Sequence, residues 1–327
     1  VLGFGGNSMV EKLQEKWNKI PVTVKVSVSY AICSIIQKCM SFITLPLFTR
    51  LLTKEQYGQY IIYSSWSGIL MIFLTLNLAY GSFQTAMIKY KNQRTEYITS
   101  IQGICLLLSC VFLVMYLPFR IWWNRLFELP TAFVILMVSE IIFTTSTQLW
   151  MGRNRFEFKY KSVVTVTLLT SILSPIIAFI LVSFSDAKGY ARILGYASIN
   201  IFVGCIIFIY NSSCGKRFYN KEFWKYAFGF NIPLLAYYLS QVIFNQSDRI
   251  MISHMTGRAD AAMYGVAYNL AMILNFVLNA INGSYVPWMY EKIKENKGED
   301  NRSVSLVLIV LMGLMILCVI WYAPEII

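Results

Sequence analysis

The chain has 327 residues, of which 57% are hydrophobic and only 13% are charged, and its formal net charge is +12. Soluble domains carry about 25% charged residues, and here the apolar residues gather in blocks of about twenty. These properties exclude a soluble globular enzyme, a disordered tail and a secreted disulfide scaffold. They predict an all-α polytopic membrane protein.

The charged residues and cysteines argue against several site types. The basic residues lie in short segments between apolar blocks, where they indicate membrane topology rather than a nucleic-acid surface. The seven cysteines fall mostly inside apolar blocks without CxxC spacing, and His254 is the only histidine. We therefore expect no metal site, no cofactor, no catalytic residue and no nucleic-acid partner.

Nine apolar blocks are long enough to cross a hydrocarbon core of about 30 Å as helices. They lie at roughly 22–48, 59–86, 98–118, 131–152, 163–184, 190–210, 227–253, 263–289 and 303–323. We divide the chain into a cytoplasmic N-terminal segment, an N-lobe with helices 1–6, a cytoplasmic linker and a partial C-lobe with helices 7–9. Their respective bounds are 1–21, 22–210, 211–226 and 227–327.

The distribution of lysine and arginine sets the predicted orientation. Nineteen of the 28 basic residues lie in the N-terminal segment and in the connections after helices 2, 4, 6 and 8. Because cytoplasmic connections are enriched in basic residues, this asymmetry places the N-terminus in the cytoplasm.

Predicted helices 1 and 7 are similar in sequence at an offset of 204 positions. The offset aligns Gln37 with Gln241, Ser41 with Asn245 and Tyr60 with Tyr264. Six helices separate the two copies, so both have the same orientation in the membrane. This predicts two parallel lobes related by an axis along the membrane normal, around a central cavity.

Polar side chains recur every three or four residues on several predicted helices, which places them on one helix face. Polar groups that face lipid lack hydrogen-bond partners, so these faces should contact protein or water. Interhelical hydrogen bonding and the wall of a central cavity both fit, and the length of the stripes favours the cavity. The cavity-lining candidates are Ser34, Gln37, Ser41, Asn77, Gln241, Asn245, Asn275 and Asn279.

Besides Lys25 and Arg192 in first turns, four charged residues lie inside predicted helices, where each ion at mid-bilayer costs at least about 2.5–3.5 kcal/mol. Lys38 and Glu140 lie near the middle of helices 1 and 4, and Asp248 and Arg249 lie in the outer half of helix 7. A structural interpretation is a Lys38–Glu140 ion pair and an Asp248–Arg249 helix cap. A functional interpretation is that Lys38 and Arg249 bind an anionic head group, while Glu140 and Asp248 set their field or carry a coupling proton.

Three segments resemble bacterial polysaccharide-biosynthesis membrane proteins of the Wzx type, the O-antigen flippases. The first is LPLFTRLLTKEQYGQY (45–60), and the second is GRNRFEFKYKSV (152–163). The third and strongest is FNQSDRIMISHMTGRADAAMYGVAYNLAMILNFVLNAINGSYVPWMYEKI (244–293). Order and spacing together make the resemblance specific.

The resemblance implies membership of the multidrug/oligosaccharidyl-lipid/polysaccharide exporter superfamily, whose members have two six-helix lobes and work by alternating access. The substrate would be an undecaprenyl-diphosphate-linked O-antigen or polysaccharide unit, moved from the cytoplasmic to the periplasmic leaflet of the bacterial inner membrane. Arg249 matches the family pattern, whereas Lys38 is supported by position alone. The chain stops after helix 9, so we expect a truncated second lobe.

No covalent chemistry is needed for this task, so we predict a transporter and not an enzyme. The expected partners are the lipid-linked substrate, membrane lipids and possible polysaccharide polymerase and chain-length proteins. Alternatives of the same superfamily are a multidrug or cation exporter and a lipid II flippase. A membrane polysaccharide polymerase is an alternative from another class, but the outer connections are short and lack histidine.

Overall fold

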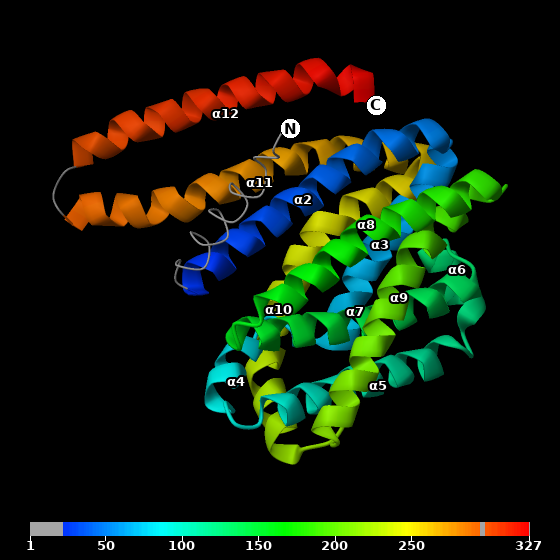
Figure 1. Cartoon of the computed structure of the whole chain (residues 1–327). Coiled ribbons are helices and arrows are strands. Elements are labelled where there is room, and N and C mark those ends of the chain that lie inside the picture. The colour runs from blue at the N-terminus through cyan, green and yellow to red at the C-terminus, as the bar shows by residue number, and fades with distance from the viewer. Residues whose placement is uncertain (1–21, 295–297, 327) are drawn as a thin grey trace, which may run out of the picture. The chain divides into compact units, whose positions relative to one another are not determined.

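A computed structural model describes residues 22–294 and 298–326, and these residues form eleven helices with no strand among them (Figure 1). In a bilayer every backbone amide must find its hydrogen bond within the protein, which favours helices even in stretches rich in β-branched residues. The prediction of an all-α polytopic membrane protein is confirmed. The helices are α2 (Val22–Leu51), α3 (Lys54–Thr75), α4 (Phe83–Lys89), α5 (Arg94–Tyr116), α6 (Arg120–Phe127), α7 (Thr131–Phe156), α8 (Tyr160–Phe184), α9 (Lys188–Gly215), α10 (Lys221–Met255), α11 (Arg258–Lys294) and α12 (Gly298–Ile326).

Six helices are long and apolar enough to cross a membrane, namely α2, α5, α7, α8, α9 and α10. They contain six of the nine predicted spans. The other three predicted spans fall in or around α3, α11 and α12, which do not meet the same combination of length and apolar content within the described residues. Their passage through the membrane stays a prediction.

The predicted helix over 59–86 is interrupted, which corrects the sequence-based assignment. Helix α3 ends at Thr75, and Leu76 and Asn77 follow with φ angles of 47° and 53° in the left-handed region. The backbone N–H of Asn77 donates a hydrogen bond of 3.2 Å to the Thr75 hydroxyl, and this bond stabilises the break in the helix. Asparagine tolerates this conformation better than most residues. Asn77 therefore lies in a turn and not on a helical stripe.

Contacts divide the described chain into two units. The first comprises the described residues of Val1–Thr44 together with Tyr63–Asp248, and the second comprises Leu45–Ile62 together with the described residues of Arg249–Ile327. The division of the chain into an N-lobe, a linker and a partial C-lobe stays a prediction.

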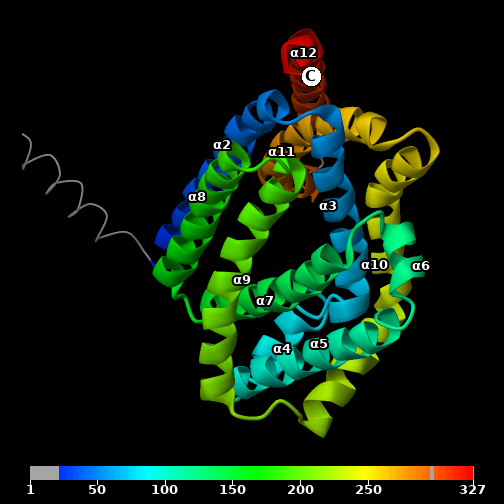
Figure 2. The same ribbon diagram turned by 90° about the vertical axis from the view of Figure 1, so that its right-hand side faces the viewer.

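In the first unit α9 is the central packing element, because it contacts α8, α7 and α5 (Figure 2). Glycines permit the close approach of these backbones. A Cβ atom at Gly195 would lie 2.3 Å from the Cα of Ala178 on α8, and one at Gly204 would lie 2.5 Å from the Phe143 carbonyl oxygen on α7. Neither position has room for a side chain.

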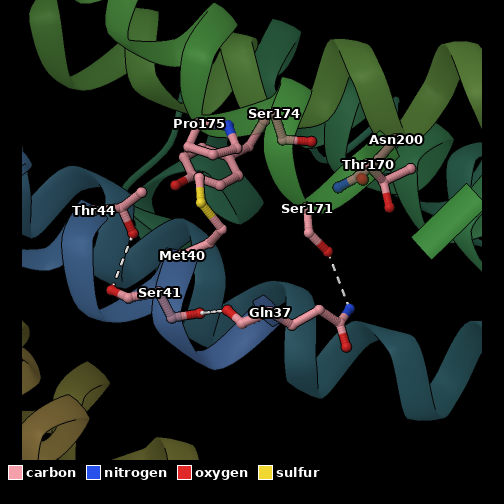
Figure 3. Close-up of a pocket in the computed structure, with 10 residues that line it drawn as sticks. Gln37, Met40, Ser41, Thr44, Thr170, Ser171, Ser174, Pro175 and Asn200 are labelled. Atoms are coloured by element: carbon pink, nitrogen blue, oxygen red, sulfur yellow. Dashed lines mark hydrogen bonds between the residues drawn. The ribbon is translucent and has the colours of Figure 1, made fainter. Parts of the chain in front are cut away.

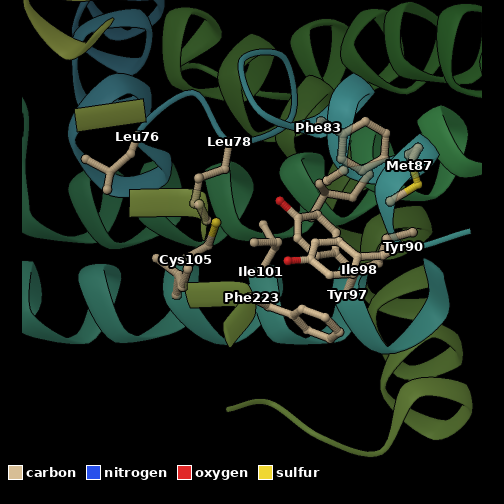
Figure 4. Packing of buried hydrophobic residues seen from close by; sticks show 14 residues of the cluster. Leu76, Leu78, Phe83, Met87, Tyr90, Tyr97, Ile98, Ile101, Cys105 and Phe223 are labelled. Atoms are coloured by element: carbon tan, nitrogen blue, oxygen red, sulfur yellow. The ribbon is translucent and has the colours of Figure 1, made fainter. Parts of the chain in front are cut away.

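The apolar core of the first unit lies where α4, the first half of α5 and the start of α10 meet (Figure 4). Phe83, Tyr97 and Phe223 are almost completely buried there. Asn231 of α10 ties this core to the turn after α3, because its amide nitrogen donates a 2.6 Å hydrogen bond to the Ser82 hydroxyl. The core thus fixes α4 and α10 against each other.

In the second unit the first turns of α3 and α11 pack together. The Lys54 ammonium lies 3.4 Å from the Met263 sulfur. A Cβ atom at Gly265 would lie 2.7 Å from the Ile61 Cδ1 atom, and one at Gly58 would meet the carbonyl oxygen of Arg258. Helix α12 packs against α11.

Candidate functional site

A cavity of about 240 Å³ lies inside the first unit, between α2, α8 and α9 (Figure 3). All the residues that line it are uncharged, and most carry a hydroxyl or an amide. They are Gln37, Met40, Ser41 and Thr44 of α2, Thr170, Ser171, Ser174 and Pro175 of α8, and Tyr196 and Asn200 of α9.

Helical periodicity builds the α2 wall of this cavity. Gln37, Ser41 and Thr44 follow one another at steps of four and three residues, so they share one face of α2. The Ser41 hydroxyl donates to the Gln37 carbonyl oxygen at 3.1 Å, and the Thr44 hydroxyl donates to the Ser41 carbonyl oxygen at 3.1 Å. Their hydroxyl protons are used within the helix, while lone pairs on the oxygens remain for another partner.

A hydrogen bond joins α2 to α8 at the edge of the cavity. The Gln37 Nε2 atom donates to the Ser171 hydroxyl at 3.1 Å, and that hydroxyl donates onward to the Thr167 carbonyl oxygen at 2.6 Å (Figure 3). Because the Ser171 proton is committed to Thr167, this hydroxyl can only accept from Gln37. The Gln37 amide is therefore oriented with its nitrogen toward α8.

The α8 wall contains a polar atom with unused bonding capacity. Ser174 is only 4% exposed, and its hydroxyl oxygen has no hydrogen-bond partner among the described residues. Next to it stands Pro175, inside the helix. Proline has no amide proton, so the Ser171 carbonyl oxygen lacks its usual helical donor. Buried polar groups without partners are rare in proteins, and they indicate a place where water or a ligand binds.

Glu140 of α7 lies directly behind the α9 wall. Its Oε1 atom accepts a hydrogen bond of 2.9 Å from Asn200 Nδ2, and its Oε2 atom accepts one of 2.7 Å from the Tyr63 hydroxyl of α3. Asn200 itself lines the cavity. A half-buried carboxylate therefore stands one hydrogen bond away from the cavity, held by donors from two other helices.

Arg249 is part of the second unit. Its side chain is buried, with 6% exposed, and its guanidinium carbon lies 4.2 Å from the centre of the Tyr268 ring on α11. This is a cation–π contact, which favours arginine over an uncharged residue at this place. The contact joins the end of α10 to α11.

Comparison with known proteins identifies the family. Residues 24–293 match the family described as polysaccharide biosynthesis protein. The chain belongs to this family. The family assignment confirms the resemblance to polysaccharide-biosynthesis membrane proteins found in the sequence.

Two relatives from Haemophilus influenzae show how widely the family's sequences diverge. Protein 1 of the Lsg locus is 23% identical over 286 residues, which cover 84% of this chain and 67% of the relative. An uncharacterized membrane protein is 25% identical over 289 residues, which cover 83% of this chain and 66% of the relative. The chain thus spans about two thirds of the length of these relatives. No solved structure matches the chain.

The structure brings together only some of the predicted site residues of this family member. Gln37 and Ser41 line the cavity, and Glu140 stands behind it. Ser34 and Lys38 are exposed on α2, outside the cavity lining. Their roles stay predictions.

The remaining predicted residues lie on α10 and α11. Gln241, Asn245 and Asp248 are exposed on α10, where the Asn245 amide donates a 2.7 Å hydrogen bond to the Gln241 carbonyl oxygen. Asn275 is exposed on α11, and the side chain of Asn279 lies outside the described residues. Among the residues that the structure describes, no group of three metal-ligating side chains comes together.

Sequence analysis missed Ser171, Ser174, Asn200 and Tyr63. The polar residues Thr170, Ser171 and Ser174 recur on one side of predicted helix 5, and this spacing was the available signal. Serine and threonine are common in membrane helices, where they bond their own backbone, so the spacing alone does not separate a cavity wall from ordinary packing. The link between Glu140 and Asn200 depends on how α7 and α9 pack.

Proposed function

We propose that this chain belongs to a flippase that moves undecaprenyl-diphosphate-linked O-antigen or polysaccharide repeat units from the cytoplasmic to the periplasmic leaflet of the bacterial inner membrane. The observation that carries the proposal is the uncharged, hydrogen-bonding cavity among membrane-crossing helices of a polysaccharide-biosynthesis protein. Hydroxyl and amide groups match the hydroxyls of sugars, because both can donate and accept hydrogen bonds without fixed charge.

The diphosphate of such a substrate needs cationic partners. Lys38 and Arg249 are the candidates, and arginine can bind a phosphate through two parallel hydrogen bonds. Arg249 already has its guanidinium over Tyr268, a contact that holds the charged group at the end of α10. The polyprenyl tail would stay in the lipid throughout.

The proposed transport cycle is alternating access between two lobes. Helices α2 and α10 end at Leu51 and Met255, and α3 and α11 begin at Lys54 and Arg258. The two helix ends are thus 204 positions apart, and so are the two helix starts, which is the offset of the sequence repeat. The close contact between Ile61 and Gly265 lies on the side of the membrane predicted to be periplasmic, so we assign it to an outer gate that must open for release.

Glu140 is the proposed coupling residue. Protonation would give one carboxyl oxygen a proton to donate and remove the negative charge, so the hydrogen bonds from Tyr63 and Asn200 would weaken or rearrange. Because Asn200 lines the cavity, this change would reach the substrate site directly. Asp248 is the second candidate, from its place beside Arg249.

The test is complementation in cells whose own O-antigen flippase has been deleted. The full-length protein is expressed there, and access of lipid-linked oligosaccharide to the periplasmic face is measured together with surface polysaccharide. We expect both to return. Failure at normal membrane abundance, repeated with several lipid-linked glycans, would contradict the proposal and favour the drug-exporter branch of the superfamily.

A further inference from the structure

We infer that the cavity between α2, α8 and α9 is a recognition subsite for a single neutral sugar ring. The inference rests on the proposed function and names the chemistry that this cavity selects. It assigns recognition of the glycan to uncharged residues that are distinct from Lys38 and Arg249, which we propose for the diphosphate. Glycan specificity and diphosphate binding would then be separate properties of the protein.

The cavity presents several hydrogen-bond acceptors beside a few donors. The Gln37 side-chain nitrogen donates to the Ser171 hydroxyl, and the Asn200 side-chain nitrogen donates to the Glu140 carboxylate. Within the described residues, the oxygen of each of these two amides accepts no hydrogen bond. The hydroxyl protons of Ser41, Thr44 and Ser171 go to backbone carbonyl oxygens. The second amide proton of Gln37 and of Asn200 and the hydroxyl proton of Ser174 can still donate, so the cavity suits groups that both donate and accept, as the hydroxyl groups of a sugar do.

The orientation of the two amides is fixed by their partners. A carboxylate only accepts hydrogen bonds, so Asn200 must turn its nitrogen to Glu140 and keep its oxygen for another donor. The Ser171 hydroxyl has committed its proton to Thr167, so Gln37 must also use its nitrogen there. Neither amide can exchange the positions of its oxygen and nitrogen without losing an existing hydrogen bond, while each nitrogen keeps a second proton that can be donated.

Ser174 is the independent sign that a ligand binds here. The residue lines the cavity and is more than nine-tenths buried, and its hydroxyl oxygen has no partner in the described chain. The neighbouring Pro175 leaves the Ser171 carbonyl oxygen without its helical donor. The Ser174 hydroxyl thus lacks a partner and the Ser171 carbonyl oxygen lacks its helical donor, and a bound polyol would offer hydrogen bonds to both.

Charge and size narrow the ligand to a neutral monosaccharide unit. No lining residue is charged, so an anionic sugar would be desolvated here without a counter-ion. Glu140 behind Asn200 adds further repulsion toward a carboxylate. The volume of about 240 Å³ suits one sugar ring and is below the range of about 300–1,000 Å³ typical of drug-sized ligands. Met40 and Pro175 add apolar surface for the carbon–hydrogen face of a ring.

The experiment measures binding of free sugars to the purified full-length protein, without transport. Saturation-transfer NMR is recorded with neutral methyl hexopyranosides, with the matching methyl hexuronides and with methyl glycosides of amino sugars. We expect transfer to at least one neutral hexoside and none to its hexuronide. Transfer to no sugar would mean a cavity filled by water alone and would overturn the inference, as would preferential transfer to the hexuronides or amino sugars.

Ser174→Ala is the decisive variant. Because the hydroxyl has no protein partner, its removal should leave thermal stability unchanged or slightly higher. Loss of one neutral hydrogen bond to the ligand should weaken hexoside binding about fivefold. Ser183→Ala on the same helix is the matched control, because Ser183 is exposed and bonds only its own helix at the Phe179 carbonyl. Equal binding by Ser174→Ala and wild type would contradict the inference.

The two proposals fail in different ways. Flipping of a lipid-linked glycan in complementation with no hexoside binding would preserve the flippase and remove the subsite. Hexoside binding that Ser174→Ala weakens, in a protein that flips no lipid-linked glycan, would preserve the subsite and remove the proposed substrate.

Discussion

Ile61 and Gly265 occupy equivalent positions in the two copies of the sequence repeat, 204 residues apart, and they lie in contact with one another. Two equivalent residues can touch only close to the axis that relates their copies. The contact therefore marks the local symmetry axis between the first turns of α3 and α11. The absence of a side chain at Gly265 makes room for Ile61, which explains why the two positions differ in residue type although the surrounding segments are similar.

A disulfide across this axis should block transport reversibly. In the double variant Ile61→Cys and Gly265→Cys the isoleucine atoms nearest Gly265 are removed, which gives the new sulfur atoms space. We expect oxidation to stop flipping and a reductant to restore it, because opening the outer gate would have to separate these residues. The measurement is periplasmic access of the lipid-linked glycan before and after reduction. Each single cysteine variant is the control and should be insensitive to oxidant. Full flipping by a protein shown to be cross-linked would rule out this gate.

Glu140→Gln should lower stability and weaken the dependence of transport on the proton gradient. Both hydrogen bonds are now made to a charged carboxylate, whereas glutamine is uncharged and has one acceptor oxygen in place of two, so both hydrogen bonds can persist only if the Tyr63 hydroxyl accepts from the amide nitrogen instead of donating. A hydrogen bond to a charged group contributes about 1.5–3 kcal/mol, and we expect a loss of this order in detergent unfolding experiments. Glu55→Gln at an exposed place on α3 is the matched control and should be neutral. Wild-type stability in Glu140→Gln would contradict the hydrogen-bond arrangement.

Gly195→Ala should destabilise the first unit by about 1–3 kcal/mol through overpacking. The new Cβ atom would lie 2.3 Å from the Cα of Ala178, so α8 and α9 would have to move apart. Gly229→Ala on α10 is the control, since no neighbouring atom lies within 4 Å of its Cβ position, and alanine also favours the helix. Thermal unfolding of the purified variants measures both effects. Equal stability of the two variants would show that α8 and α9 are not in close contact.

Hydropathy predicts the helices well because each crossing needs a long apolar run. The ends are less visible: α10 begins at Lys221, before the predicted start at 227, because its first turn carries charged residues that no hydropathy pattern distinguishes from a loop. The break after Thr75 was missed for a different reason. The stretch around Leu76 and Asn77 remains mostly apolar, and its left-handed turn is stabilised by Thr75 and by Asn231 from a distant helix.

The site was only partly predictable, for a similar reason. The stripe on α2 followed from spacing, and Gln37 and Ser41 do line the cavity. For Ser174 the spacing on α8 gives only a weak signal, because the lack of a hydrogen-bond partner for its hydroxyl depends on the packing of α8 against its neighbours. Likewise Glu140 stands out in the sequence as a charged residue in an apolar helix, but its hydrogen bond with Asn200 depends on how α7 packs against α9, which the sequence does not show.

Lys38→Ala and Arg249→Ala should each abolish flipping in the full-length protein while membrane insertion continues. Removal of either cation would leave part of the diphosphate charge without a partner in a medium of low dielectric constant. Arg249→Ala should also lower stability slightly, because its contact with Tyr268 is lost. Arg249→Lys keeps the charge but not the planar fork of donors, and we expect it to recover only part of the activity.

Lys161→Ala, at an exposed lysine in the first turn of α8, is the matched control for the loss of one positive charge. Flipping is measured by complementation at equal membrane abundance. If both alanine variants complement as well as wild type, the diphosphate is bound elsewhere.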